Sequence, residues 1–384
     1  MRKLPLFLAC ALLATSLAAC NGDNTDDHKE TGTGTESSSD KNWWGGISSG
    51  GDSTESSSEN HWWNVDETES SDEFANLPAS EGLAFISDPE GNGYSVAYIG
   101  TCTDSVVVIP SEYKGSPVTS IGDSAFKDCS SITGVVIPDS VTSIGEGAFY
   151  ECGSLASVAI GNSVTSIGEG AFYSCDNLTS VHINDIAAWC GISFGSRSAN
   201  PLCHAHNLYV NGELLTNLVI PDGVTSIGQY CFYECQSIKE VTIPGSVTSI
   251  GGSCFGGGTS IESVYISDIA AWCNIDFGEY SPLYGANLYV QNELITELVI
   301  PEGVASIKRY AFSGCKSIVT VKIPNSVKEI GEFAFYRCSR LNKAYFANTN
   351  GWKYVLWGSY RDADISDPSV AAERMVNGNS LVKE

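Results

Sequence analysis

One short phrase recurs through most of the chain and limits what the chain can fold into. A Val-Thr-Ser-Ile phrase, or its variants Val-Ala-Ser-Ile and Val-Lys-Glu-Ile, ends at Ile121, Ile144, Ile167, Ile227, Ile250, Ile307 and Ile330. Four of the six intervals between these isoleucines are 23 residues long. A period in the twenties predicts one solenoid coil per repeat, because so small a unit buries its apolar face only by stacking on neighbours.

Two further positions keep the same phase. A phenylalanine follows each isoleucine by five residues, at Phe126, Phe149, Phe172, Phe232, Phe255, Phe312 and Phe335. A cysteine follows six of these by three residues, at Cys129, Cys152, Cys175, Cys235, Cys315 and Cys338. We expect the Leu-x-x-Val-x-Ile run to form a strand with Val and Ile inward, and the phrase to form a second extended segment. Ala-Phe should form a tight helical or 3₁₀ turn that drives the ring into the core.

This repeat resembles the BspA-like leucine-rich repeat of bacterial surface proteins, in phrase, period and cysteine position, over most of residues 106–346. The resemblance implies a β-rich leucine-rich-repeat solenoid with short helical turns, and adhesion as a function. Residues 78–105 look like the strands that lead into the repeats of that family. Over residues 347–384 we expect a C-terminal cap, in which Asp367-Pro368 predicts the start of a helix.

The two long intervals contain related inserts, at about 184–217 and 267–297, in which Asp-Ile-Ala-Ala-Trp-Cys and Asn-Leu-Tyr-Val occur twice. Each insert predicts a short helix capped by its aspartate, followed by a hairpin that turns at Asn211-Gly212 or Gln291-Asn292. We therefore expect a duplicated unit of about 80 residues, whose inserts project from or thicken one edge of the stack.

Residues 1–19 are typical of a secretory signal peptide, with two basic residues, an apolar run and small residues at its end. Leu17-Ala18-Ala19-Cys20 resembles the bacterial lipobox, which implies that Cys20 carries lipid and anchors the exported chain to the cell envelope. The alternative is an ordinary signal peptide with an incidental cysteine. No later apolar run reaches the ~20 residues of a membrane-spanning helix.

Residues 20–77 are rich in Ser, Thr and Gly and predict a disordered acidic tether. Between Asn21 and Glu73, fourteen acidic side chains stand against two lysines, a net charge of −12. The tether contains two tryptophan pairs, Trp43-Trp44 and Trp62-Trp63, which are interpreted as a sticker for a partner or glycan, a segment that docks on the solenoid, or an accidental duplication. The net charge of −25 for the whole chain argues against nucleic acid as a partner.

Fourteen cysteines in an exported chain suggest disulfides, but most of them share repeat positions. Stacked coils direct such side chains in parallel, which is poor disulfide geometry, so we expect buried free thiols. Cys102 and Cys203 are out of phase and are the better candidates for a bridge or a reactive thiol. Cys203-His204-Ala205-His206 is the one cluster of metal-ligand types, and it lacks a fourth ligand. We predict no metal, no cofactor and no enzyme, since no nucleophile elbow or phosphate loop is present.

What remains is a surface. Between the inward Val and Ile of each strand, one residue points outward and varies: Val108, Val136, Ala159, His182, Val219, Thr242, Tyr265, Val299, Lys322 and Tyr345. The predicted ligand-binding face is His182, Thr242, Tyr265, Lys322 and Tyr345. The leading hypothesis is a surface-exposed lipoprotein that binds extracellular protein. The alternatives are a glycan-binding protein and a non-binding envelope spacer, and variation through solvent exposure alone stays open.

Overall fold

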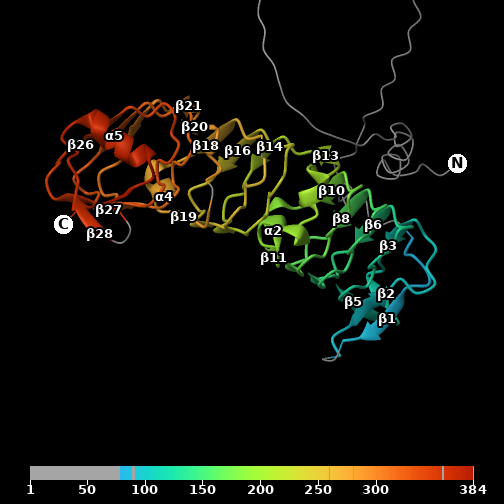
Figure 1. The fold of residues 1–384 in the computed structure, drawn as a ribbon. Helices are drawn as coiled ribbons and strands as arrows, with labels where there is room; N and C mark the ends of the chain where they lie inside the picture. The colour runs from blue at the N-terminus through green and yellow to red at the C-terminus, as the bar shows by residue number, and fades with distance from the viewer. Residues whose placement is uncertain (1–77, 89–90, 259, 280, 357–358, 384) are drawn as a thin grey trace, which may run out of the picture.

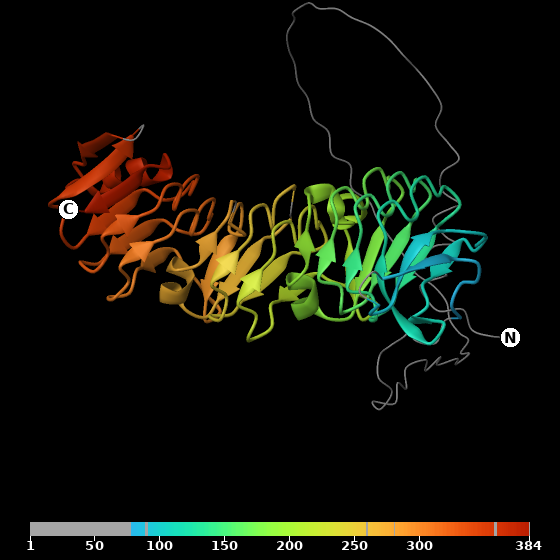
Figure 2. The ribbon, with the colours of Figure 1, turned by 90° about the horizontal axis from the view of Figure 1, so that it is seen from below.

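The computed structural model describes residues 78–88, 91–258, 260–279, 281–356 and 359–383. They form an elongated, curved stack of coils, which runs from β1 and β2 at the blue end to α5 at the red end (Figure 1), and the turned view in Figure 2 shows the same elongation. The predicted β-rich solenoid is confirmed. The signal peptide, Cys20 and the tether with both tryptophan pairs lie outside the described residues.

Each regular coil contributes one longer strand to a first ladder, in which strands of successive coils pair in parallel. The first ladder comprises three sheets. Their strands are β3 (Val106–Val108), β6 (Gly134–Ile137), β8 (Ser157–Ile160), β10 (Ser180–Ile183), β12 (Leu208–Val210) and β13 (Glu213–Leu214); β14 (Asn217–Val219), β16 (Glu240–Ile243), β18 (Ser263–Ile266), β20 (Asn287–Val290) and β21 (Glu293–Leu294); and β22 (Glu297–Val299), β24 (Thr320–Ile323) and β26 (Lys343–Phe346). As expected, Val and Ile of these strands point into the core.

The repeated phrase contributes a short strand to a second ladder on another side of the stack. Its strands are β1 (Ala84–Ser87), β2 (Tyr94–Tyr98), β4 (Glu112–Tyr113), β5 (Ser116–Ile121), β7 (Ser143–Ile144), β9 (Ser166–Ile167) and β11 (Ser193–Phe194); β15 (Ser226–Ile227), β17 (Ser249–Ile250) and β19 (Asp276–Phe277); and β23 (Ser306–Ile307), β25 (Glu329–Ile330), β27 (Trp352–Leu356), β28 (Ser359–Asp362) and β29 (Ser380–Lys383). The isoleucine that ends each phrase is at most 2% exposed, so it closes the core from this side.

The phenylalanines stack on one another within each run of regular coils, as Phe126–Phe149–Phe172, Phe232–Phe255 and Phe312–Phe335. The ring centroids of Phe126 and Phe149, and of Phe149 and Phe172, lie 5.1 Å apart. The backbone follows the same register, because Phe126 N donates to the Ala148 carbonyl of the next coil at 2.7 Å. Offset-stacked rings at this distance add specific packing to the burial of the ring.

The tight turn expected at Ala-Phe is confirmed, and the ring is buried as predicted. In the first regular coil, Ala125 N donates to the Gly122 carbonyl at 3.2 Å and Lys127 N to the Ser124 carbonyl at 3.1 Å, the i→i+3 spacing of a 3₁₀ turn. Left-handed backbone flanks these turns in each regular coil, as at Ser124 (φ 55°) and Asp128 (φ 60°) in the first. Each segment therefore stays a single turn and does not continue into a longer helix.

The inserts extend the stack by further coils and do not project from its edge, and their predicted aspartate-capped helices are confirmed. In the first insert, α2 (Ile186–Cys190) is N-capped by Asp185, whose carboxylate accepts from Ala187 N and Ala188 N. β11 then pairs in parallel with β9, so the insert completes a further coil. The first insert also contains η1 (Arg197–Ala199) and α3 (Leu202–Ala205). The helix of the second insert is α4 (Ile269–Cys273), which is capped by Asp268. In Figure 1, α2 lies beside β11, and α4 lies beside β19.

The predicted hairpins are confirmed and account for the breaks in the first ladder. Asn211 and Gly212 adopt positive φ of 51° and 83° between β12 and β13. Gln291 and Asn292 do the same, at 51° and 67°, between β20 and β21. Because β13 and β21 run antiparallel, the next coil begins a new sheet.

One tryptophan ties each insert to the following coil. The Trp272 indole N–H donates to the Ala311 carbonyl at 2.7 Å, and the Trp189 indole N–H donates to the Cys231 carbonyl at 3.0 Å. In regular coils this carbonyl accepts from the phenylalanine N–H of the preceding coil. The insert has no such phenylalanine, so the indole supplies the missing donor.

Both ends of the second ladder finish in antiparallel strands. β1 pairs antiparallel with β2 at the start, and β29 pairs antiparallel with β25 at the end. The predicted helix is α5 (Pro368–Val376), whose N-cap Asp367 accepts from Ser369 N at 2.7 Å. Within the described part of the chain, helices are too short or too polar to cross a bilayer.

We predict that Trp272→Phe destabilises the protein more than Trp189→Phe does. Both variants lose the same indole ring atoms from a buried site. The Cys231 carbonyl keeps a second donor, the Asn200 amide at 3.0 Å, whereas Trp272→Phe leaves the Ala311 carbonyl without its side-chain donor. Leaving a buried acceptor unpaired costs about 1–3 kcal/mol. Urea unfolding of the two variants measures the difference, and equal losses would contradict this role of the indole.

Candidate ligand-binding face

The first ladder aligns its outward-pointing residues in one row. We call this the outer row: Val108, Val136, Ala159, His182 and Tyr209; Val219, Thr242, Tyr265 and Tyr289; Val299, Lys322 and Tyr345. Parallel pairing places each residue directly beside its neighbour, as with His182 opposite Tyr209 and Tyr265 opposite Tyr289. The residue before each one points inward and is fully buried, as at Val181 and Val264. The backbone therefore fixes the direction of every member.

All five residues of the predicted face lie in the outer row, but the structure does not bring them into one cluster. His182 belongs to the first sheet of the ladder, Thr242 and Tyr265 to the second, and Lys322 and Tyr345 to the third. Lys322 is also engaged locally, because its ammonium lies 2.6 Å from Glu297 Oε1. The basic group that the sequence places on this face is thus largely neutralised.

His182 contributes an aromatic ring rather than a charge. Burial lowers the pKa of His182 to about 4, so the imidazole is neutral at physiological pH. Its ring stacks on Tyr209 with centroids 4.8 Å apart and an interplanar angle of 14°. The equivalent pair in the second unit, Tyr265 and Tyr289, stacks at the same distance.

Tyr209 and Tyr289 were not among the predicted residues, because they belong to the inserts. The signal was present: the Asn-Leu-Tyr-Val run has the same inward and outward alternation as the strands of the regular coils. Both tyrosines also contact the hairpin strands, where Leu214 lies opposite Tyr209, and Leu294 opposite Tyr289.

We group the apolar residues of the outer row around each hairpin, with the leucine of the hairpin itself, into two equivalent clusters. Cluster 1 consists of His182, Tyr209, Leu214 and Val219, and cluster 2 consists of Tyr265, Tyr289, Leu294 and Val299. The aliphatic members are exposed by 43% at Leu214, 53% at Val219, 45% at Leu294 and 49% at Val299. Acidic side chains border both clusters, as Glu213 and Glu293 do on the hairpin strands. Each cluster therefore presents exposed hydrocarbon beside aromatic rings that are already held in place.

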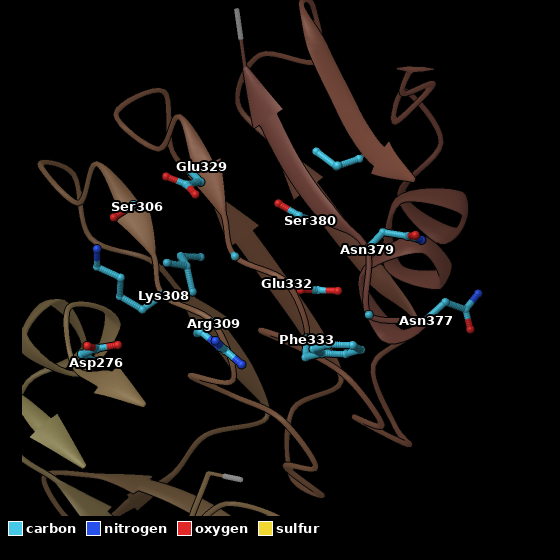
Figure 3. Close-up of a pocket in the computed structure, with 14 residues that line it drawn as sticks. Asp276, Ser306, Lys308, Arg309, Glu329, Glu332, Phe333, Asn377, Asn379 and Ser380 are labelled. Atoms are coloured by element: carbon cyan, nitrogen blue, oxygen red, sulfur yellow. The ribbon is translucent and has the colours of Figure 1, made fainter. Parts of the chain in front are cut away.

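A groove of about 920 Å³ lies on the other side of the molecule, between the last coils and the cap. Figure 3 shows Lys308 and Arg309 on one wall, and Asn377 and Asn379 on the other. The Arg309 guanidinium lies over the Tyr310 ring, 4.7 Å from its centroid. Acidic and basic side chains alternate here, and among the residues that the structure describes no group of His, Cys, Asp or Glu is arranged to hold a metal ion.

The Cys203-His204-Ala205-His206 cluster is dispersed among separate contacts. His204 Nδ1 lies 3.7 Å from Asp176 Oδ1, and burial is the main cause that lowers the pKa of His204. His206 Nδ1 lies 3.1 Å from the Glu234 carbonyl. Cys203 is a half-buried free thiol, as is Cys102. The two histidines thus make separate contacts, one with Asp176 and one with the Glu234 carbonyl.

The expectation of buried free thiols in the repeats is confirmed for most of them. Cys152 Sγ donates to the Phe126 carbonyl of the preceding coil at 3.0 Å, and Cys175 Sγ donates to the Phe149 carbonyl at 3.1 Å. Cys129 is the exception and is half-exposed. It lies in the first regular coil, so no preceding coil offers an equivalent phenylalanine carbonyl. Burial raises the pKa of Cys152 and of Cys175 to about 12. These thiols are packing groups and not nucleophiles.

Comparison with known proteins identifies the repeat. A family profile described as BspA type Leucine rich repeat region (6 copies) matches residues 105–193, 205–281 and 284–353, more than half of the chain. No curated protein matches this chain significantly. Similar solved structures include a leucine rich cell surface protein from Faecalibacterium prausnitzii, 27% identical over 71% of this chain and 77% of that chain, with a TM-score of 0.43. Another is a leucine-rich repeat protein from Bacteroides ovatus, 24% identical over 70% of each chain, with a TM-score of 0.39. A third is the pneumococcal vaccine antigen PcpA, 17% identical over 71% and 68%, with a TM-score of 0.34.

We predict that the free energy of unfolding of the Cys152→Ala/Cys175→Ala variant falls less steeply with rising pH than that of the wild type. Unfolded thiols ionise near their ordinary pKa of 9.0, whereas the native ones stay protonated up to about 12. The contribution of these thiols to the free energy of unfolding is therefore complete below pH 9 and is lost as the pH rises through 12. Each thiol accounts for up to about 1.4 kcal/mol per pH unit in that window.

Urea unfolding at several pH values between about 8 and 11 measures this slope. Val158→Ala is the control, since it removes buried hydrocarbon without a titratable group and should lower stability equally at every pH. Parallel curves for the wild type and the double cysteine variant would show that these thiols do not carry the pH dependence.

Proposed function

Because the chain belongs to the BspA-type leucine-rich repeat family, we propose that it is a surface protein whose outer row binds an extracellular protein. The observation that carries this proposal is the pair of equivalent clusters 1 and 2. A solenoid of leucine-rich repeats is typically a non-catalytic scaffold, and its extended faces are its binding surfaces. Family membership supports the surface role, and the clusters supply a place for a ligand.

The composition of the clusters favours a protein partner. Single exposed aliphatic residues are ordinary, but contiguous ones mark interaction sites. In each cluster, an exposed leucine lies opposite one ring of a stacked aromatic pair, and an exposed valine starts the next sheet of the first ladder. Buried aromatic side chains dominate the binding energy of protein interfaces. The rings are held by the ladder before binding, so little side-chain freedom is lost when a partner covers them.

A glycan is the second candidate, and the stacking makes it the weaker one. Sugar rings stack on open aromatic faces, whereas the rings of Tyr265 and Tyr289 lie face to face, 4.8 Å apart. The exposed ring of Tyr345 favours a glycan. It is 42% exposed, and in the described structure β26 is the last strand of its sheet. A polysaccharide arm therefore belongs in the binding experiment.

We predict that Leu294→Asp in cluster 2 weakens protein binding about tenfold or more, because a charge at a desolvated contact costs at least 1.4 kcal/mol. Leu294 is 45% exposed, so the fold should tolerate the change. Val370→Asp on α5, where Val370 is 38% exposed and lies outside the outer row, is the matched control and should bind normally. Biolayer interferometry against extracellular-matrix proteins and a polysaccharide panel gives the affinities.

The outcomes separate the three functions. Loss of protein binding in Leu294→Asp alone supports the proposal. Binding only to polysaccharide favours the glycan candidate, and absence of binding to either class favours a structural spacer. Equal binding by the wild type and Leu294→Asp would place the ligand away from cluster 2 and overturn this assignment.

The proposed anchor is the lipid on Cys20, supported by the lipobox resemblance. We predict that Cys20→Ser abolishes incorporation of radiolabelled palmitate and moves the full chain from the detergent phase to the aqueous phase, because two or more acyl chains are needed for stable anchoring. Antibody labelling of intact cells tests exposure in parallel. Retention of the Cys20→Ser chain in the detergent phase would show that another feature holds it to the membrane.

A further inference from the structure

Two members of the outer row are buried where their equivalents are not. Val136 and Ala159 are each 2% exposed, although both point away from the core. At the same position, Val219 is 53% and Val299 is 49% exposed. The side chain of Ser157, which also points outward from β8, is buried as well, and its hydroxyl has no hydrogen-bond partner among the described residues.

The ladder itself does not explain this burial. Val135 and Val158 belong to the main core on the inner face of β6 and β8. Val136 and Ala159 form a separate apolar cluster, against which Val108 is the one further described residue that packs. We call Val108, Val136 and Ala159 the N-terminal patch. Three small side chains in one row do not cover one another from above, so another group must lie over them.

The chain before the solenoid arrives at this place. Ser80 N donates to the Val108 carbonyl at 2.9 Å, and Val108 N donates to Ser80 Oγ at 3.0 Å. Ala79 lines a groove of about 400 Å³ together with all three residues of the N-terminal patch. The residues that precede Pro78 therefore reach the described structure directly at the edge of the patch.

We propose that the segment Phe74–Leu77 packs across the N-terminal patch, with the side chains of Phe74 and Leu77 on Val136 and Ala159. Few residues between Asn21 and Leu77 are strongly apolar, and two of them fall in these four positions. Burying a Phe and a Leu contributes about 1.5–3 kcal/mol for each side chain, enough to hold a short segment in place. This proposal is independent of the ligand of clusters 1 and 2.

Length and charge both fit this segment. The patch spans two strand spacings, roughly 10 Å, and the five residue-to-residue steps from Phe74 to Ala79 reach roughly 17 Å when extended. Glu112 and Asp139 line the same groove. Phe74–Leu77 is uncharged, whereas Asp72 and Glu73 immediately before it would be repelled, which sets the upstream limit of the contact.

The test uses a cysteine at the patch as a reporter of cover. Ala159→Cys is introduced into the full mature chain in detergent, and its reaction with a maleimide is followed by peptide mass spectrometry. We expect Phe74→Asp/Leu77→Asp to accelerate this reaction about tenfold or more, because two buried carboxylates expel the segment. Ile47→Asp/Val65→Asp adds the same charge elsewhere in residues 21–77, and should leave the rate unchanged.

Several results would overturn the proposal. One is an Ala159→Cys thiol that reacts as fast as Val219→Cys in the otherwise unchanged chain. Another is a rate that Phe74→Asp/Leu77→Asp does not alter, and a third is protection that rises with protein concentration, which assigns the cover to a second copy. Hydrogen exchange gives an independent measurement without substitution at the patch: amides of residues 74–77 should exchange more slowly than those of residues 61–64.

Discussion

In-register stacking of one coil on the next is the interaction on which the rest of the structure depends. Phe126 N bonds to the Ala148 carbonyl, and the two phenylalanine rings of these coils lie 5.1 Å apart. Because both the backbone and the rings repeat with the coil, the core residues of successive regular coils meet their own equivalents. The outward residues inherit the same order, so the outer row follows directly from the core and needs no separate device.

The inserts show how the stack tolerates an interruption. They lack the repeated phenylalanine, yet Trp189 and Trp272 donate to the carbonyls that would otherwise lose a partner. Asp185 and Asp268 cap the first helix of each insert, and the short strand that follows pairs with the preceding coil, as β11 does with β9. The hairpins then interrupt the first ladder without ending the outer row. Apolar side chains gather at these two interruptions, where clusters 1 and 2 lie.

The sequence predicted the parts of the fold that depend on a repeated pattern. The 23-residue period gave the coils, and local chemistry gave the helix caps and the hairpin turns. The Ala-Phe turns were predicted as well, but not the left-handed backbone at residues such as Asp128, because that conformation usually signals glycine. Tyr209 and Tyr289 were missed because the inserts were interpreted as departures from the stack. The burial of Val136 and Ala159 could not be predicted, because the periodicity gives every residue of the outer row the same outward position.

The antiparallel strands at the two ends of the second ladder have a consequence for assembly. Parallel coils have no intrinsic last member, since each exposed edge is a template for one more coil, whether from the same molecule or from another. β1 forms one outer edge of the second ladder, and β28 forms the other, beyond β29 and β27; each pairs antiparallel with its neighbour. The parallel pattern of the phrase strands therefore does not continue to either outer edge. The protein can thus lengthen during evolution by gaining internal coils, while the antiparallel strands at both ends stay the same.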